Sequence, residues 1–314
     1  MRKVIGIGET VLDIIFRDNQ PIAAVPGGST FNAMISLGRS GVPAVLISET
    51  GDDRVGRFVT DFMAQNGVDT SEMNRMAGIK SPLSLAFLNE SNDAEYIFYK
   101  DEKRAQSIQP FNPSAIQPDD LVLFGSYYAL NPDTRPQVKA LLEEARRQGA
   151  IIYYDVNFRP AHQSEIMKIR PNLIENLEMA DIVRGSREDF EVLFGLDDAE
   201  KVYYEKIAFY CPNFIYTDSS RPARLFATGG VQRDYPVEKT EVVSTIGAGD
   251  NFNAGMLYGL IKAGLTREQL TQGLSASQWD TVVGEGRQFA AEVCKTIYNY
   301  VGNDFGQAKR NALT

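Results

Sequence analysis

The sequence contains few of the residues on which several common kinds of site depend. Its 314 residues include two cysteines, Cys211 and Cys294, and one histidine, His162. Two cysteines supply neither a disulfide framework nor a zinc pattern, which favours the reducing cytoplasm. One histidine argues against a metal site built from several histidines and against a histidine triad. We therefore expect any general base to be a carboxylate.

A basic surface and a long hydrophobic run are also missing. Thirty-two basic and 41 acidic side chains give a net charge of −9, which argues against a nucleic-acid interface but not against a nucleotide held by local donors. No apolar run reaches the ~18 residues of a membrane span. The apolar run within residues 1–10 is too short for a signal peptide. A cytoplasmic protein with no membrane partner is predicted.

Short apolar runs alternate along the chain with amphipathic patterns. Strands are expected at 3–9, 44–51 and 121–126, and helices at 29–41, 53–67 and 134–149. No repeat or linker interrupts the alternation, so residues 1–314 are predicted to form a single α/β domain. Its sheet should be mainly parallel and covered by helices on both faces, with sites at the carboxyl ends of the strands.

Two segments, 13–25 and 84–100, break this alternation. Each has turn residues, Asp18-Asn19 and 89–93, between two apolar arms, which is typical of a hairpin. We expect the two hairpins to form a small separate sheet that acts as a lid over a pocket and offers a face for dimerisation. The alternative is that they extend the edge of the main sheet.

The run "STIGAGDNFNAG" (244–255) places a carboxylate directly behind a glycine turn. The amphipathic stretch after Gly247, Ala248 and Gly249 predicts a helix that begins there and contains Asp250 in its first turn. Free amide groups at such a turn form an anion hole, and an adjacent carboxylate is suited to take a proton from an attacking hydroxyl. The alternative is an acidic residue that only caps a helix.

Several motifs in order along the chain resemble one family. "STIGAGDNFNAG" is joined by "GETVLD" (8–13), "PGGSTFNAMISLGRSG" (26–41), "ISETGDDRVGRF" (47–58), "FGSYYAL" and "YDVNFRP". Together they resemble the ribokinase-like (PfkB-type) carbohydrate kinases, in particular the fructokinase-like branch. The resemblance implies a three-layer α/β/α sandwich with a mostly parallel central sheet and a small β-sheet lid. It also implies phosphorylation of a sugar hydroxyl that depends on ATP and Mg²⁺.

The resemblance also assigns roles to individual residues. Asp250 matches the catalytic base, with Gly247, Ala248 and Gly249 as the anion hole. The sugar-contacting positions of the family fall on Asp13, Gly27, Gly28 and Asn32. Arg159 matches an arginine near the sugar or the phosphates, and its alternative role is a salt bridge to Asp155.

Three motifs depart from the family pattern. Ser244 replaces the aspartate that opens the C-terminal motif, which argues against activation by a monovalent cation. The nucleotide loop keeps Thr217 but has Ser219 and Pro222 at its glycine positions, and proline lacks an N–H donor. In the magnesium motif Ser186 replaces the asparagine and Asp189 replaces the glutamate, so Asp189 or Glu188 would act on Mg²⁺ through water.

The sequence leaves the substrate open. A fructose-like ketose is the first expectation, and 2-keto-3-deoxygluconate is the second, because Arg159 with Lys100, Lys103 or Arg104 would hold a carboxylate. A sugar-binding protein with a degenerate nucleotide site remains a further alternative. An NAD-dependent oxidoreductase is disfavoured because the glycine fingerprint of that class is missing.

Overall fold

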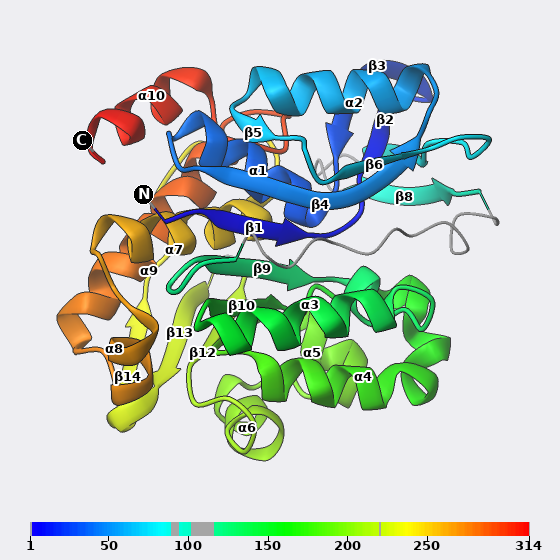
Figure 1. Cartoon of the computed structure of the whole chain (residues 1–314). Helices are drawn as coiled ribbons and strands as arrows, with labels where there is room; N and C mark the ends of the chain where they lie inside the picture. Colours follow the sequence, from blue (N-terminus) through cyan, green and yellow to red (C-terminus); the bar gives the residue numbers. More distant parts are fainter. Residues whose placement is uncertain (1, 89–93, 102–115, 220, 314) are drawn as a thin grey trace.

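The computed structural model describes residues 2–88, 94–101, 116–219 and 221–313. In these ranges, ten strands form one sheet and four strands form a smaller one (Figure 1). The turn at 89–93, together with Lys103 and Arg104, lies outside the described residues.

The large sheet is mainly parallel. β13 is antiparallel to both of its neighbours, and every other described pair in the sheet is parallel. In spatial order the strands are β14 (Val231–Tyr235), β13 (Arg221–Ala227), β12 (Phe214–Asp218), β11 (Ile182–Ser186), β10 (Ile151–Asp155), β9 (Leu121–Gly125), β1 (Val4–Ile7), β4 (Ala44–Gly51) and β5 (Val68–Asp69), with β6 (Met73–Met76) also paired to β4. The predicted fold class is confirmed.

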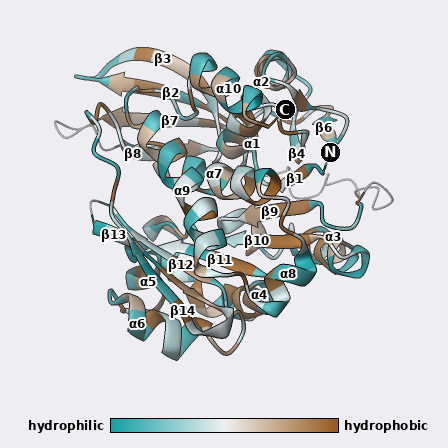
Figure 2. Cartoon of the chain, turned by 90° about the vertical axis from the view of Figure 1, so that its left-hand side faces the viewer, coloured by the Kyte–Doolittle hydropathy of each residue, from teal (hydrophilic) through white to brown (hydrophobic). Residues whose placement is uncertain are grey.

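Helices cover both faces of this sheet because successive strand residues point to opposite sides. Ile151 and Tyr153 enter one core, and Ile152 and Tyr154 enter the other. The first core is covered by α1 (Ser29–Arg39), α2 (Arg54–Gln65), α7 (Ala248–Lys262), α8 (Arg267–Gln272), α9 (Ala276–Val293) and α10 (Asn303–Asn311), and the second by α3 (Arg135–Gln148), α4 (Ile166–Met179), α5 (Arg187–Phe194) and α6 (Ala199–Val202). Figure 2 shows the hydrophobic colour gathered on β9 and β10 between these layers.

Short helical turns complete the connections. They are η3 (Tyr127–Ala129), η4 (Pro160–Glu165), the π-helical η5 (Tyr203–Ile207) and η6 (Thr228–Gly230). Among the described helices, none has the length and hydrophobicity that crossing a bilayer would require.

The order of the strands identifies where a ligand would enter. From β1 the chain passes through α1 to β4 on one side, and β9 then pairs with β1 on its other side. Open α/β sheets bind ligands at the carboxyl ends of the strands where the connections diverge in this way. The divergence lies at the ends of β1 and β9, next to the start of α1.

The smaller sheet is made by the two predicted hairpins. Its order is β3 (Gln20–Gly27), β2 (Val11–Arg17), β7 (Leu83–Leu88) and β8 (Ala94–Tyr99), with β2 and β7 parallel. Asp18 and Asn19 take positive φ angles in the first turn. This sheet is separate from the large one, so the alternative of an extended main sheet is wrong. It lies beyond the carboxyl ends of β1 and β4 (Figure 1).

Glycines allow α7 and α9 to approach closely. A Cβ atom on Gly255 would lie 2.4 Å from the carbonyl oxygen of Glu285 and 2.7 Å from Cα of Gly286. One on Gly259 would lie 2.9 Å from Cα of Val282. Neither neighbour is a flexible side-chain end, so α7 needs small residues to occupy its place against the sheet.

We expect Gly255→Ala to destabilise the protein by about 1–3 kcal/mol, because the overpacking outweighs the helix propensity of alanine. Gly284→Ala in α9 is the matched control, since a Cβ atom there has no heavy atom within 4 Å. That change should stabilise by up to about 1 kcal/mol. Urea unfolding of both variants measures the difference, and equal effects would contradict the packing argument.

Candidate active site

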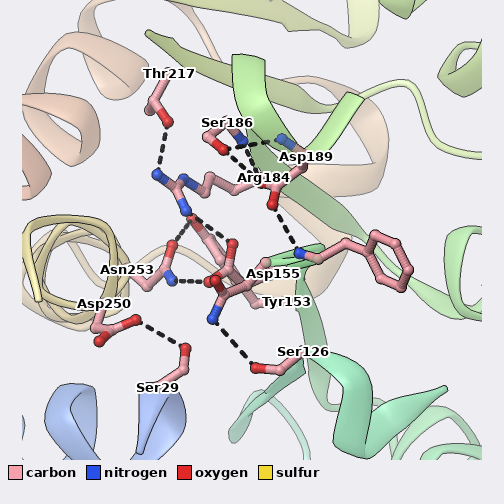
Figure 3. A network of polar contacts seen from close by, with 12 residues as sticks. Ser29, Ser126, Tyr153, Asp155, Arg184, Ser186, Asp189, Thr217, Asp250 and Asn253 are labelled. Carbon is pink, nitrogen blue, oxygen red and sulfur yellow. Dashed lines mark hydrogen bonds and ion pairs between the residues drawn. The ribbon is translucent and has the colours of Figure 1, made fainter. Parts of the chain in front are cut away.

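Asp250 is fixed at the point where α1 and α7 meet. Gly247 takes a left-handed conformation with φ of 76°, and α7 starts at the next residue. Asp250 is therefore the third residue of the helix, as the glycine turn predicted. Ser29 Oγ donates to Asp250 Oδ1 at 2.8 Å (Figure 3), and Asn32 Nδ2 donates to Oδ2 at 2.8 Å. The first turn of α1 thus orients both carboxylate oxygens.

The first turn of α7 supplies amide donors next to this carboxylate. The N–H of Ala248 is used within the turn, where it donates to Thr245 O at 3.1 Å. The next two amides, on Gly249 and Asp250, occupy positions that have no partner inside a helix. An anion at this point would also be favoured by the helix dipole. Of the three residues expected to form the anion hole, Gly249 is the one best suited to donate.

A buried arginine that the sequence reasoning did not single out lies against this turn. Arg184, in β11, is 7% exposed, and a Cβ atom on Gly249 would lie 3.0 Å from both of its Nη atoms. An arginine inside the apolar strand "DIVRGS" was the signal that could have identified it. It brings a permanent positive charge to the amides of α7.

Arg184 is held by a chain of buried polar contacts (Figure 3). It donates to Asp155 Oδ1 at 3.0 Å and to Thr217 Oγ1 at 2.6 Å. Asn253 Nδ2 donates to the second oxygen of Asp155 at 2.8 Å, and Asn253 Oδ1 accepts from the Tyr153 hydroxyl at 3.0 Å. Burial opposes the charge on Arg184, but the combined effect of Asp155, Asp189 and Tyr153 outweighs it and raises the pKa of the guanidinium.

The residues predicted to contact a sugar also gather here. Asp13 is 6% exposed, and a Cβ atom on Gly27 would lie 2.4 Å from its Oδ2. Gly28 has φ of 124°, and its Cβ atom would lie 2.4 Å from the carbonyl oxygen of Glu9. The two glycines therefore make room for the Asp13 carboxylate and the Glu9 carbonyl.

The carboxyl groups of Asp13 and Asp250 resist ionisation. Burial raises the pKa of Asp13 to about 6, opposed by hydrogen bonds from Ser84 and Asn299 and reinforced by Asp250 and Glu9. Burial also raises the pKa of Asp250, while the hydrogen bonds from Asn32 and Ser29 act in the opposite direction. A carboxylate with a raised pKa is a stronger base, which is the property that proton abstraction requires.

Arg159 lies at the rim of this group. It is exposed, directly after β10, and its charge lowers the pKa of Asp250. Asp155 is paired with Arg184 and not with Arg159, so the alternative role of Arg159 as the Asp155 partner is wrong. Nearby, Ser126 and Asn157 have φ of 56° and 34°, and Asn157 Nδ2 donates to Ser126 Oγ at 3.2 Å. Such strained residues are typical of functional sites.

The residues expected to act on magnesium are used differently. Ser186 and Asp189 form a capping box at the start of α5, and Asp189 also accepts from the Phe158 amide at 2.7 Å. Glu188 is exposed on the same turn. Among the described residues, no three histidine, cysteine or acidic side chains are grouped to hold a metal. Asp189 is engaged in supporting the backbone and does not fit the role of a metal ligand.

The segment expected to bind the nucleotide is the turn between β12 and β13. Asp218 pairs there with Arg187 at 3.1 Å and with Arg221 at 3.2 Å, and Ser219 has φ of 43°. Pro222 lies in β13 and is exposed. Thr217 is the residue of this turn that contacts the buried network, through Arg184.

Ser244 precedes the glycine turn without supplying a charge. It is buried, and its hydroxyl accepts from the Ile246 amide at 3.2 Å. The amides of Val243 and Ser244 both donate to the carbonyl oxygen of Cys294. The position therefore offers backbone and hydroxyl groups but no carboxylate to a cation.

Asp13→Asn should stabilise the folded chain at pH 7. The carboxyl group ionises near pH 4 when unfolded but near pH 6 when folded, so stability falls as pH rises through this window. Removing the charge should recover up to about 3 kcal/mol at pH 7 and nothing below pH 4. Thermal unfolding against pH measures the effect. A variant equally destabilised at every pH would contradict it.

Comparison with known proteins indicates the family to which this chain belongs. The model of the pfkB family carbohydrate kinases matches residues 1–281. A 5-dehydro-2-deoxygluconokinase of Geobacillus thermodenitrificans is 26% identical over 261 residues, covering 80% of this chain and 77% of that one. A fructokinase of Klebsiella pneumoniae is 26% identical over 271 residues, covering 84% and 86%.

Solved structures share the fold. A fructokinase from Vibrio cholerae O395 with fructose, ADP and calcium ion bound has a TM-score of 0.82 at 19% identity, covering 98% of both chains. An aminoimidazole riboside kinase from Salmonella enterica, complexed with aminoimidazole riboside and an ATP analog, has a TM-score of 0.79 at 20% identity, covering 99% of this chain and 100% of that one. With a family model that matches most of its length, the chain belongs to the pfkB family of carbohydrate kinases and is a sugar kinase.

Proposed function

We propose that this sugar kinase transfers the γ-phosphoryl group of ATP to a hydroxyl of a fructose-like ketose. The observation that carries the proposal is the position of Asp250. Its carboxylate is oriented by Ser29 and Asn32, at 2.8 Å each, directly beside the amides that begin α7. A base and an anion-binding turn on consecutive residues suit attack by a hydroxyl on a phosphoryl group.

Each group has a separate part in the reaction. Asp250 accepts the proton of the attacking hydroxyl, and its raised pKa strengthens it for that task. The amides of Gly249 and Asp250 stabilise the charge on the transferring phosphoryl oxygens, assisted by the guanidinium of Arg184. Arg184 needs no reorganisation at that moment, because Asp155 and Thr217 already hold it.

Asp13 and Asn32 supply hydroxyl-binding groups on the sugar side. Asn32 donates to Asp250 through Nδ2, while its Oδ1 is buried and has no hydrogen-bond partner among the described residues. A buried acceptor without a donor costs stability unless a ligand completes it. A sugar hydroxyl is such a donor. The fructokinases among the relatives and solved structures support fructose as the first choice.

An acidic keto-deoxy sugar is the second candidate. It is favoured by Arg159, whose exposed charge acts on Asp250, and by the relatives named 5-dehydro-2-deoxygluconokinase. Arg159 would pair with the sugar carboxylate. The reading of the chain as a sugar-binding protein without kinase activity loses its support, because the matching family and relatives are kinases.

The phosphoryl donor is proposed to be MgATP bound as a substrate. The ATP analog and ADP in the solved relatives support the nucleotide. Thr217, Ser186 and Ser219 stand at the ends of β11 and β12, on the side of Arg184 away from Asp13, and remain our proposed nucleotide contacts. Magnesium would arrive with the nucleotide and not on Asp189, since Asp189 caps α5. Potassium is not expected to be required.

The small sheet is proposed to act as the lid and as a dimer interface. β8 is an edge strand, and Tyr96, Ile97, Phe98 and Tyr99 expose apolar side chains along it. Edge strands with exposed apolar groups favour pairing with a second chain. The cytoplasmic location remains a prediction from the cysteine content.

ADP release from MgATP with fructose, ribose and keto-deoxy sugar acids tests the proposal directly. With the sugar that supports turnover, Asp250→Asn should lower kcat by about 10²- to 10⁴-fold while the sugar KM stays within a few-fold. Asp304→Asn is the matched control, because Asp304 is an exposed acid in the first turn of α10. Undiminished kcat in Asp250→Asn would remove the proposed base.

Arg159→Ala distinguishes the two substrate classes. Loss of a charged hydrogen bond should raise the KM of an acidic sugar by about 10- to 100-fold and change that of fructose by less than about threefold. Arg170→Ala, an exposed arginine of α4, is the control. Equal losses on neutral and acidic sugars would exclude a carboxylate clamp at Arg159.

A further inference from the structure

Asn299 is a buried residue from the far end of the chain that reaches the sugar side of the site. It lies between α9 and α10 and is 2% exposed. Its Nδ2 donates to Asp13 Oδ2 at 3.2 Å, across 286 positions of sequence. Ser84 Oγ donates to the other oxygen, Oδ1. One neutral donor therefore serves each oxygen of the Asp13 carboxylate.

The orientation of the Asn299 amide is set by that carboxylate. Its Oδ1 is buried and has no hydrogen-bond partner among the described residues. Turning the amide over would bring this oxygen against Asp13 Oδ2, where two acceptors repel. The protein thus leaves one buried acceptor unsatisfied in order to keep an N–H group on Asp13.

The backbone of the same residue supports the turn that precedes α7. Asn299 O accepts from Asn251 Nδ2 at 2.8 Å, and Asn251 Nδ2 also donates to Gly247 O at 2.8 Å. A Cβ atom on Gly247 would lie 2.7 Å from Asn299 O. Asn299 therefore touches the phosphoryl side through its carbonyl and the sugar side through its side chain.

Because the titratable groups around Asp13 disfavour its negative charge, a neutral hydrogen-bond donor stabilises its carboxylate. Its titratable neighbours that raise its pKa or respond to its charge are Glu9 after β1, Tyr96 on β8, Asp250 on α7 and Tyr300 beside Asn299. Lys100 is committed to Glu9 at 2.7 Å, and Arg159 acts on Asp250 and Tyr96. In the described residues Asp13 forms no ion pair, so Ser84 and Asn299 are its stabilising partners.

We propose that Asn299 is a positioning residue for the sugar, which holds the ionised Asp13 carboxylate in place and connects it to the glycine turn of the phosphoryl site. The proposal rests on the proposed function in one respect, that Asp13 accepts a sugar hydroxyl. Nothing in the sequence around "TIYNYVG" indicates this role, since no motif contains Asn299.

Two variants test the proposal through kinetics. Asn299→Ala removes the donor, and Asn299→Asp replaces it with an acid of the same shape. Each should raise the sugar KM at pH 7 by about tenfold or more, with the ATP KM within about twofold. Because the donor lowers the pKa of Asp13, the rise of the sugar KM on acidification should begin at a higher pH in both variants than in the parent.

A buried asparagine far from the site provides the control. Asn213 is 3% exposed at the amino end of β12, where it bonds to Thr228 and Asp181. Asn213→Ala should lower the melting temperature without moving the pH at which the sugar KM changes. A pH profile unchanged in the Asn299 variants, or moved equally by Asn213→Ala, would overturn the proposal.

A second measurement does not depend on catalysis. The melting temperature is followed against pH in the parent, Asn299→Ala, Asp13→Asn and the double variant. In Asn299→Ala the loss of folding stability with rising pH should continue to a higher pH, because a higher pKa of folded Asp13 raises the upper end of the pH range in which stability falls. This effect should appear only in proteins that keep Asp13. The same pH dependence in both backgrounds would exclude the Asn299–Asp13 link. Absence of sugar turnover in the parent, with this coupling intact, would instead contradict the proposed function alone.

Discussion

The hydrogen bonds from α1 to the carboxylate of Asp250 are the contact on which the rest of the site depends. α1 follows β3 of the small sheet near the start of the chain, and α7 follows the last strand of the large sheet. The hydrogen bonds between the first turns of α1 and α7 bring the amides of Gly249 and Asp250 to the same side of the site as Asp13. The close approach requires glycine on both sides, at Gly28 against Glu9 and at Gly247 against Asn299. The glycines are thus as necessary to the geometry as the acids.

The buried carboxylates fall into two groups that differ in what neutralises them. Asp155 pairs with the guanidinium of Arg184, and the same positive charge acts on Asp189, which also accepts from the amides of Ser186 and Phe158. In the described residues, Asp13 and Asp250 form no ion pair and are held by hydroxyl and amide groups only. Asp155 and Asp189 support the architecture. Asp13 and Asp250 remain more basic than they would be if a cation were paired with them. Folding stability is therefore lowered at the residues to which we assign proton transfer and sugar binding.

Much of the fold was predictable because its signals are local. The alternation of apolar runs predicted the parallel sheet, and the turn residues predicted both hairpins and a separate small sheet, all of which the structure confirms. The start of α7 at the "GAGD" run was predictable from helix chemistry alone. The network through Arg184, and the contact between Asn299 and Asp13, depend on residues brought together from distant positions. Contacts between such distant residues cannot be predicted from sequence spacing. The magnesium motif was misleading for another reason: a capping box and a metal motif use the same residue types, and Asp189 proved to be part of a helix cap.

The contact between residues 13 and 299 also constrains how the protein is made. During synthesis β1, the small sheet and α1 emerge long before the segment that follows α9. Until that segment arrives, the Asp13 carboxylate lacks one of its two donors and the Gly247 turn lacks the carbonyl that it packs against. Both halves of the site are completed by one late event. The Asp13 side of the site and the Gly247 turn would therefore be completed together, only once residue 299 has been added to the chain.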